Sequence, residues 1–338
     1  MTIAGLGRRR QQPTTYQETS GPTPKLLPAL RRELPGPRRD LWYRMVLPMS
    51  LNLKLAVLTV VITFPVLCAS RTDEMASTIA QSGGLCSSPG DTFIQCTQFS
   101  PVLGKDESFA VHLPSQSSRG EYCAILVLHG AGRNSLTLIS NPDTRSVLEQ
   151  SGCVIIFPNG RSSWWLDTAY GKYQSYVIEL LDRLRVPLHL SSDSRRYAVA
   201  GWSMGGFGSL RLIERYPERF AAWAGLLTLA DFPNPAYPAA ENYTVPELFG
   251  PPGRWPELNP MAQVEKLRGK SLWFTTGSAA FDLRMNESLD RKLTGLGMSP
   301  EFHVSPGGHE FRVVAENLQG LLRFLESETS LKSETDHR

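Results

Sequence analysis

The chain is 338 residues long, with 41% hydrophobic and 20% charged residues and a formal net charge of +3. This composition is typical of a globular protein and excludes a wholly disordered one. The positive charge is concentrated in residues 1–44, where nine basic and three acidic residues leave a surplus of six, so the rest of the chain carries −3. A slightly acidic body argues against nucleic acid as a partner.

The N-terminal part of the chain has two segments of different character. Residues 1–44 are rich in Arg, Pro, Gln and Thr without apolar periodicity, which predicts a disordered basic extension. Segment 45–70 contains an uncharged apolar run that is shorter than the ~18 residues expected of a membrane span and ends in small residues, as in a secretory signal peptide. Because signal peptides begin at the N-terminus, we expect a true start at Met45 or Met49, with 1–44 untranslated. The alternative is a signal anchor with a basic cytoplasmic tail.

These features predict a secreted or periplasmic protein, or one that contacts the membrane only through an uncleaved N-terminal segment. Four cysteines follow that segment, and an even number in an exported chain is compatible with two disulfides. Cys86 with Cys96 is the locally plausible pair. Cys123 and Cys153 each begin an apolar run, and small buried hydrophobic residues would explain them equally well. Their pairing stays open at this point.

After residue 70 the chain has no internal repeat and no second linker, so we expect one domain over 71–328 and a disordered tail over 329–338. Short apolar runs bounded by turn residues predict buried strands at 109–114, 123–128, 153–157, 197–200, 271–276 and 301–304. Apolar residues at helical spacing predict helices at 173–184, 207–216, 285–296 and 313–326. The alternation predicts the α/β class, with a doubly wound, mostly parallel sheet and helices on both faces. Ligands are then expected beyond the carboxyl ends of the strands.

One motif lies at such a strand end. The run Gly201-Trp202-Ser203-Met204-Gly205 has the form G-x-S-x-G, and it lies between the predicted strand 197–200 and helix 207–216. A strand that turns directly into a helix strains the turn residue, which the flanking glycines make room for. Ser203 would then lie at the positive end of the helix. The motif also occurs by chance, so a catalytic role for Ser203 depends on finding a base and an acid elsewhere in the chain.

A serine hydroxyl needs a base, most often His, that is oriented by a carboxylate. His309 lies in a Gly-rich loop between the last predicted strand and the last predicted helix, and we predict it to be the base. Asp282 follows the strand 271–276 and is the predicted acid, although it could instead cap the next helix. Asp231 is the competing acid, because it too follows an apolar run.

Acyl transfer also needs donors for the developing oxyanion. We expect the backbone N–H of Met204, directly after the serine, to be one donor. The other should come from the loop after the strand 123–128, where Ala131 is the first choice and Gly130 the second. We expect a structural role for the neighbouring His129.

Several separate motifs in the right order resemble the esterase D-like family of α/β-hydrolases, over residues 99–326. They are Leu128–Gly132, Pro158–Arg161 with Ser163–Trp165, Ala200–Gly208, Tyr216–Phe220, Leu248–Gly250, Gly277–Asp282 and Pro306–His309. The resemblance implies the α/β-hydrolase fold and a triad of Ser203, Asp282 and His309. It also implies Met204 and Ala131 as oxyanion donors. The segment 228–231 departs from the family pattern, in which many members have a Ser-Gly pair, so the resemblance does not imply the shape of the substrate pocket.

The expected function is that of a serine carboxylic-ester hydrolase that forms an acyl-enzyme on a small-molecule or carbohydrate ester, without metal or cofactor. An acyltransferase with the same triad is one alternative. The others are a thioesterase like S-formylglutathione hydrolase, a member of the family, and a non-catalytic binding protein. Substrate-binding residues are expected at Gly130, Trp164, Trp165 and Trp202, although packing would explain Trp164 and Trp165 equally well. The Pro-rich insertion 232–260 could form part of a substrate wall, and Asn286 fits the pattern for N-glycosylation.

Overall fold

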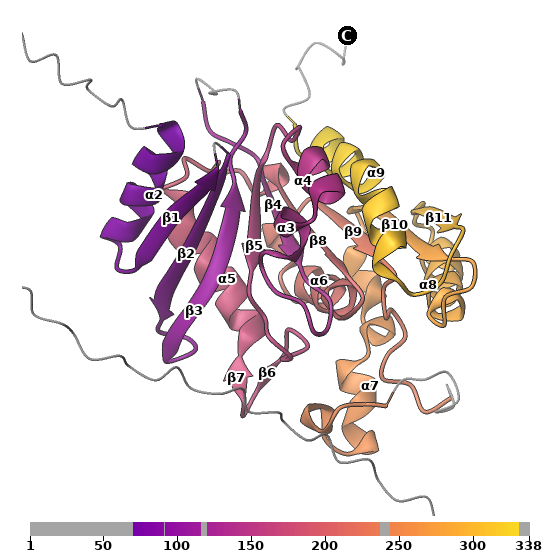
Figure 1. The fold of residues 1–338 in the computed structure, drawn as a ribbon. Coiled ribbons are helices and arrows are strands. Elements are labelled where there is room, and N and C mark those ends of the chain that lie inside the picture. The colour runs from indigo at the N-terminus through magenta and orange to yellow at the C-terminus, as the bar shows by residue number, and fades with distance from the viewer. Residues whose placement is uncertain (1–69, 91, 116–119, 237–243, 331–338) are drawn as a thin grey trace, which may run out of the picture. The chain divides into compact units, whose positions relative to one another are not determined.

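The computed structural model describes residues 70–90, 92–115, 120–236 and 244–330 (Figure 1). The predicted extension 1–44 lies outside the described residues. So does all of segment 45–70 except Ser70, which is the N-cap of the first helix. Among the helices of the described ranges, none is both long enough and apolar enough to cross a membrane.

A nine-stranded sheet forms the centre of the described domain, in the order β1-β2-β3-β5-β4-β8-β9-β10-β11. The pairs from β1 to β5 are antiparallel, and all pairs from β5 to β11 are parallel. The strands are β1 (Leu85–Gly90), β2 (Phe93–Ser100), β3 (Lys105–His112), β4 (Ala124–Leu128), β5 (Val154–Pro158), β8 (Tyr197–Trp202), β9 (Ala222–Leu226), β10 (Ser271–Gly277) and β11 (Glu301–Ser305). A separate ribbon pairs β6 (Asp167–Thr168) with β7 (Gly171–Lys172).

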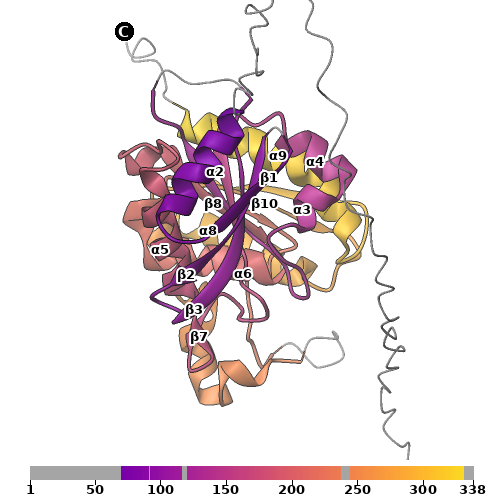
Figure 2. The ribbon, with the colours of Figure 1, turned by 60° about the vertical axis from the view of Figure 1, so that its left-hand side comes forward.

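Helices cover both faces of this sheet (Figures 1 and 2). They are α2 (Arg71–Gln81), α3 (Thr137–Ser140), α4 (Pro142–Leu148), α5 (Tyr173–Arg185), α6 (Met204–Arg215), α7 (Trp255–Leu258), α8 (Leu283–Gly295) and α9 (Phe311–Thr329). The apolar sides of α2, α5, α6 and α8 share one hydrophobic cluster, and those of α3, α4 and α9 share another. Successive residues of β4 alternate between the two clusters, Leu126 in the first and Val127 in the second, as the pleat of a strand requires. The predicted doubly wound, mostly parallel sheet is confirmed.

Several boundaries differ from the sequence-based expectation, and two of them have a local cause. The strand expected at 109–114 is β3, which begins earlier because its polar first half pairs in register with β2, Lys105 opposite Ser100. Pro114 has no N–H to donate and lies outside the ladder. Thr329, expected to be the first residue of a disordered tail, is instead the last residue of α9, and its buried hydroxyl donates to the Leu325 carbonyl. Residues 331–338 lie outside the described ranges.

Both cysteine pairs form disulfides. Cys86 and Cys96 are directly opposite one another in the β1–β2 ladder, which confirms the expected local pair. Cys123 and Cys153 are also joined. They precede β4 and β5, which are neighbouring parallel strands whose first residues pair in register, Ala124 with Val154. The pairing that the sequence left open therefore follows from the adjacency of two strands.

Removing the Cys123–Cys153 bond should cost more stability than removing the other. Its cysteines are 30 residues apart, against 10 for Cys86–Cys96. In the chain-entropy model the longer loop gives a loss of about 3–4 kcal/mol for the double variant Cys123→Ala/Cys153→Ala, and the shorter loop a loss of about 2–3 kcal/mol. Urea unfolding of both double variants measures the difference. A larger loss in the Cys86/Cys96 variant would contradict the expectation.

Candidate active site

Ser203 occupies a strained turn between β8 and α6. Its backbone has φ +55° and ψ −119°, a conformation that non-glycine residues rarely adopt. Two glycines make this turn possible. A Cβ on Gly201 would lie 2.2 Å from the Gly205 carbonyl oxygen, and a Cβ on Gly205 would lie 1.9 Å from the Leu128 carbonyl oxygen. The backbone of β4 therefore leaves room only for glycine on the helix side of Ser203.

A chain of hydrogen bonds links the serine, the histidine and the aspartate. Ser203 Oγ lies 2.8 Å from His309 Nε2, and His309 Nδ1 lies 2.6 Å from Asp282 Oδ1. The imidazole also stacks on the ring of Phe281, with centroids 4.4 Å apart. The structure thus brings together the three residues that the sequence predicts, from the ends of β8 and β10 and from the loop after β11. In this arrangement His309 can accept the serine proton while Asp282 holds the ring.

The carboxylate of Asp282 is fully buried and hydrogen-bonded on both oxygens. Oδ2 accepts from Thr276 Oγ1 at 2.5 Å and from Asn286 Nδ2 at 2.9 Å. Asp282 does occupy the N-cap position of α8, but its side chain makes no capping hydrogen bond. Asp282 is therefore the N-cap residue of α8 by position, while its side chain bonds His309, Thr276 and Asn286 instead of the helix backbone. The competing acid, Asp231, instead accepts from the side chains of Asn234 and Asn259.

Thr276 and Asn286, which hold Asp282, were not predicted in this role from the sequence. Asn286 is fully buried and also donates to the Thr228 carbonyl, so its side chain is not accessible for N-glycosylation. The spacing of Asp282 and Asn286 in the sequence could have indicated the contact between them. Asn286 lies four residues after Asp282 at the start of a helix, and such residues share one helix face.

The predicted oxyanion donors are both near Ser203, since Met204 follows it directly in the chain and Ala131 lines one cavity with it. Met204 is the first residue of α6, where a backbone N–H has no acceptor within the helix. Ala131 lies in the loop after β4 and is exposed. An oxyanion formed at Ser203 would meet the positive end of α6 there. The oxyanion role of these two N–H groups stays a prediction.

His129 fixes the loop that carries Ala131. Its Nδ1 hydrogen-bonds the Gly130 carbonyl at 2.8 Å, and its Nε2 accepts the Gly160 N–H at 2.9 Å. Burial lowers the pKa of His129 below its usual value, which keeps the ring neutral, as an accepting Nε2 requires. The His129 carbonyl in turn accepts from Trp165 Nε1 at 3.2 Å. His129 therefore has the structural role expected of it and joins the loops after β4 and β5.

Two cavities meet at Ala131. The larger is about 940 Å³, and its lining includes Trp164, Met204, Pro246 and Leu248 as well as Ala131. The smaller is about 200 Å³, and its lining includes Ala131, Gly130, Trp202, Ser203 and His309. Part of the insertion 232–260 therefore does line a cavity at the site. Gly130 and Trp202, both expected to contact substrate, face the smaller cavity.

The two neighbouring tryptophans have different roles. Trp164 lines the larger cavity and packs among Phe207, Phe232 and Phe249, with ring centroids 5.0–5.5 Å away. Trp165 is only 1% exposed, and its ring lies directly against Gly160 and Gly208. The expectation that Trp165 contacts substrate is wrong, because the ring fills the space between two backbone segments.

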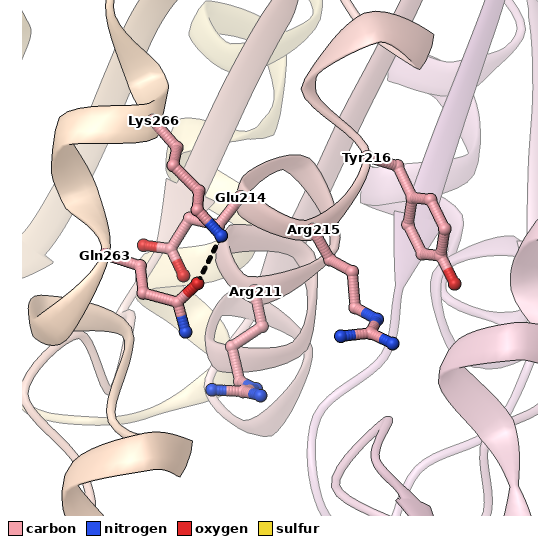
Figure 3. Close-up of a pocket in the computed structure, with 6 residues that line it drawn as sticks. All are labelled: Arg211, Glu214, Arg215, Tyr216, Gln263 and Lys266. Atoms are coloured by element: carbon pink, nitrogen blue, oxygen red, sulfur yellow. Dashed lines mark hydrogen bonds between the residues drawn. The ribbon is translucent and has the colours of Figure 1, made fainter.

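A third pocket, of about 210 Å³, lies beside the last turn of α6 (Figure 3). Arg211, Glu214, Arg215 and Lys266 are among its lining residues, and the three residues of the hydrogen-bonded chain are not. Glu214 is 2% exposed, and its Oε1 has no hydrogen-bond partner among the described residues. Burial raises the pKa of Glu214 well above its usual value, and the nearby cations Arg211, Lys266 and Lys292 offset this only in part.

The buried Glu214 should make stability depend on pH. Because its pKa is raised in the folded state, the folded protein binds the proton more tightly than the unfolded chain. The resulting stabilisation is complete below the unfolded pKa and is lost as pH rises through the folded pKa. Glu214→Gln should therefore gain about 1–3 kcal/mol at pH 8 and flatten the pH profile of stability. Melting temperatures between pH 5 and 8 test this, with the exposed neighbour Glu265→Gln as control. An equal profile in both variants would contradict it.

A family model and two curated proteins match this chain. A family model, Esterase (described as "Putative esterase"), matches residues 100–325. Two curated proteins of Mycobacterium tuberculosis, Esterase MT1326 and Esterase Rv1288, are each 23% identical over 247 residues, covering 62% of this chain and 54% of the relative. The chain thus spans about half the length of these relatives.

Solved structures share the fold. FphF, a fluorophosphonate-binding serine hydrolase of Staphylococcus aureus, has a TM-score of 0.61 at 19% identity, covering 69% of this chain and 97% of that one. An S-formylglutathione hydrolase (FrmB) from the same species gives 0.60 at 19% identity, covering 69% and 98%. A ferulic acid esterase gives 0.62 at 21% identity, covering 70% and 98%. At these identities the likeness shows the α/β-hydrolase fold alone.

Proposed function

Because this chain belongs to the Esterase family of α/β-hydrolases, we propose that it is a serine esterase that hydrolyses carboxylic esters through Ser203, His309 and Asp282. The observation that carries the proposal is the unbroken chain of hydrogen bonds from Ser203 Oγ through His309 to the buried Asp282. Each of the three groups has the partner that its role requires.

Acylation begins when Ser203 Oγ attacks the ester carbonyl and His309 Nε2 takes the hydroxyl proton. The carbonyl oxygen becomes negative and accepts hydrogen bonds from the N–H groups of Met204 and Ala131. Removing one such donor typically costs several kcal/mol of transition-state stabilisation. His309 then gives its proton to the departing alcohol oxygen, and the acyl group stays on Ser203 as an ester.

Deacylation repeats the same steps with water. His309 takes a proton from the water as the water attacks the acyl-enzyme, and it returns that proton to Ser203 Oγ when the acid leaves. Throughout, Asp282 keeps His309 in the tautomer with the proton on Nδ1. Its own orientation is kept by Thr276 and Asn286.

The active-site serine can be tested directly with a fluorophosphonate, which phosphonylates activated serines. The structural neighbour FphF is described as fluorophosphonate-binding. We expect the full-length protein to take up one label, on Ser203, as mapped by peptide mass spectrometry. A p-nitrophenyl ester should give an initial burst of p-nitrophenol close to one equivalent where deacylation is slow. Label on another residue, with Ser203 unmodified, would overturn the assignment.

We further propose that the protein acts outside the cytoplasm. Two disulfides support an oxidising compartment, where such bonds persist. The export-type segment that the sequence predicts at 45–70 points the same way. Fractionation of cells that express the full chain, with a thiol-reactive probe to count free cysteines, tests the proposal. Recovery in the cytoplasm with the four cysteines reduced would contradict it.

Transfer of the acyl group to an alcohol is the second candidate. It uses the same acyl-enzyme. His309 lines the smaller cavity, so an acceptor alcohol bound there would lie beside the base that deprotonates it. Hydrolysis in the presence of a competing alcohol separates the two outcomes. The ratio of the new ester to the free carboxylic acid shows whether the acyl-enzyme prefers the alcohol or water as acceptor.

A further inference from the structure

The two cavities differ in which catalytic groups line them. His309 and Ser203 line the smaller cavity, together with Arg133, Glu310 and Phe311. Met204, whose N–H is a proposed oxyanion donor, lines the larger one instead. Ala131 borders both. An ester bound at Ser203 would therefore place its two halves in unlike surroundings.

The chemistry decides which half lies where. In the tetrahedral intermediate the alcohol oxygen must face His309 Nε2, because that nitrogen delivers the proton on which the alcohol leaves. The oxyanion points to Met204 and Ala131, so the acyl chain points to the remaining side. The alcohol half consequently belongs to the cavity that His309 lines, and the acyl half belongs to the other.

Resting on the esterase function proposed above, we infer that the 940 Å³ cavity is the acyl site and that this enzyme acts on esters of bulky acyl groups. Its size is in the range of pockets that bind drug-sized ligands, whereas the 200 Å³ cavity on the alcohol side is below that range. A formyl or acetyl group would leave most of the larger cavity unfilled. The structure thereby favours a bulky acyl ester over a formyl thioester as substrate.

The walls of the larger cavity are built to hold their shape. Arg161 and Trp164, which line it, both have positive φ, of +49° and +55°, and such strain gathers where the surrounding structure fixes a ligand site. Trp164 is fixed by its aromatic neighbours. Arg161 and Tyr173 both hydrogen-bond the buried carboxylate of Glu107. An acyl group would therefore enter a preformed site, with little free energy spent on ordering it.

Two matched ester series test the inference on the full-length protein. In the first, the alcohol is always p-nitrophenol and the acyl group grows from acetyl through butyryl to octanoyl and 3-phenylpropanoyl. We expect kcat/KM to rise at least about tenfold from acetyl to the bulky acyl groups, since each well-packed methylene contributes to transition-state binding. In the second, the acyl group is constant and the alcohol grows, and we expect a rise of less than about threefold because the alcohol site is small.

Filling the cavity should remove this preference. Leu248→Trp adds an indole to the larger cavity, and we expect the octanoyl-to-acetyl ratio of kcat/KM to fall by about tenfold. The matched control is Leu85→Trp, on the 82% exposed Leu85 of β1, which should leave the ratio unchanged. A best rate with acetyl, or the same ratio in both variants, would overturn the acyl-site assignment while leaving the esterase function intact. Absence of any Ser203-dependent hydrolysis would instead overturn the esterase proposal itself.

Discussion

Ser203→Ala is expected to lower kcat for ester hydrolysis by about 10⁵–10⁶-fold, because it removes the only atom that can carry the acyl group in the proposed mechanism. His309 and the oxyanion donors remain in the variant, so a small residual rate above that in water should persist. The measurement is single-turnover and steady-state hydrolysis of a p-nitrophenyl ester by the full-length protein.

The control for this variant is Ser209→Ala, in helix α6, which begins directly after Ser203. Ser209 is also buried, but its hydroxyl bonds the Gly206 carbonyl and the Trp223 indole instead of His309. We expect Ser209→Ala to cost stability and to keep kcat within a few-fold of wild type. If Ser203→Ala retained activity within tenfold of wild type, the nucleophile would have to be a different residue.

Asp282→Asn should cost about 10⁴-fold in kcat with little change in the fold. The reason lies in the surroundings of the carboxylate, which are all donors. His309 Nδ1–H faces one oxygen, and Thr276 Oγ1 and Asn286 Nδ2 face the other. An amide must turn its NH₂ toward one of these donors. If it faces His309, Nδ1 has to become the acceptor, and Nε2 then carries the proton and cannot take one from Ser203.

The competing carboxylate supplies the matched control. Asp231→Asn makes the same chemical change in a side chain whose oxygens accept from Asn234 and Asn259. We expect it to reduce kcat by less than tenfold. Nitrogen NMR of the histidine ring should show the Nδ1–H tautomer in wild type and the Nε2–H tautomer in Asp282→Asn. A larger loss from Asp231→Asn than from Asp282→Asn would exchange their roles.

Much of the site could be predicted from the sequence because its residues lie at strand ends. In a parallel sheet the carboxyl ends meet along one edge, so Ser203 after β8 and Asp282 after β10 had to come near one another. His309 could be chosen for a similar reason, since it follows the last strand in a loop with the freedom that glycine supplies. Chain order and local turn chemistry suffice for residues of this kind.

What the sequence could not supply was adjacency between elements far apart in the chain. The disulfide between Cys123 and Cys153 depends on β4 lying next to β5. The local sequence around either cysteine does not indicate its partner. Trp164 and Trp165 are neighbours of the same residue type, yet Trp164 lines the larger cavity while Trp165 is buried against Gly160 and Gly208. The burial of Asn286 likewise depends on the packing of α8.

The strands β4 and β5 are tied at both of their ends. The Cys123–Cys153 bond joins their starts, and the His129 imidazole joins the loops that leave their far ends. Because these two attachments hold β4 and β5 together, we expect that the segment after Gly160 can be replaced without disturbing the strand pair. Grafting a foreign stretch in place of 166–172, with His129 and Trp165 kept, should exchange one acyl preference for another on an unaltered catalytic frame. We therefore expect the fold to accept new acyl specificities through the replacement of this one loop.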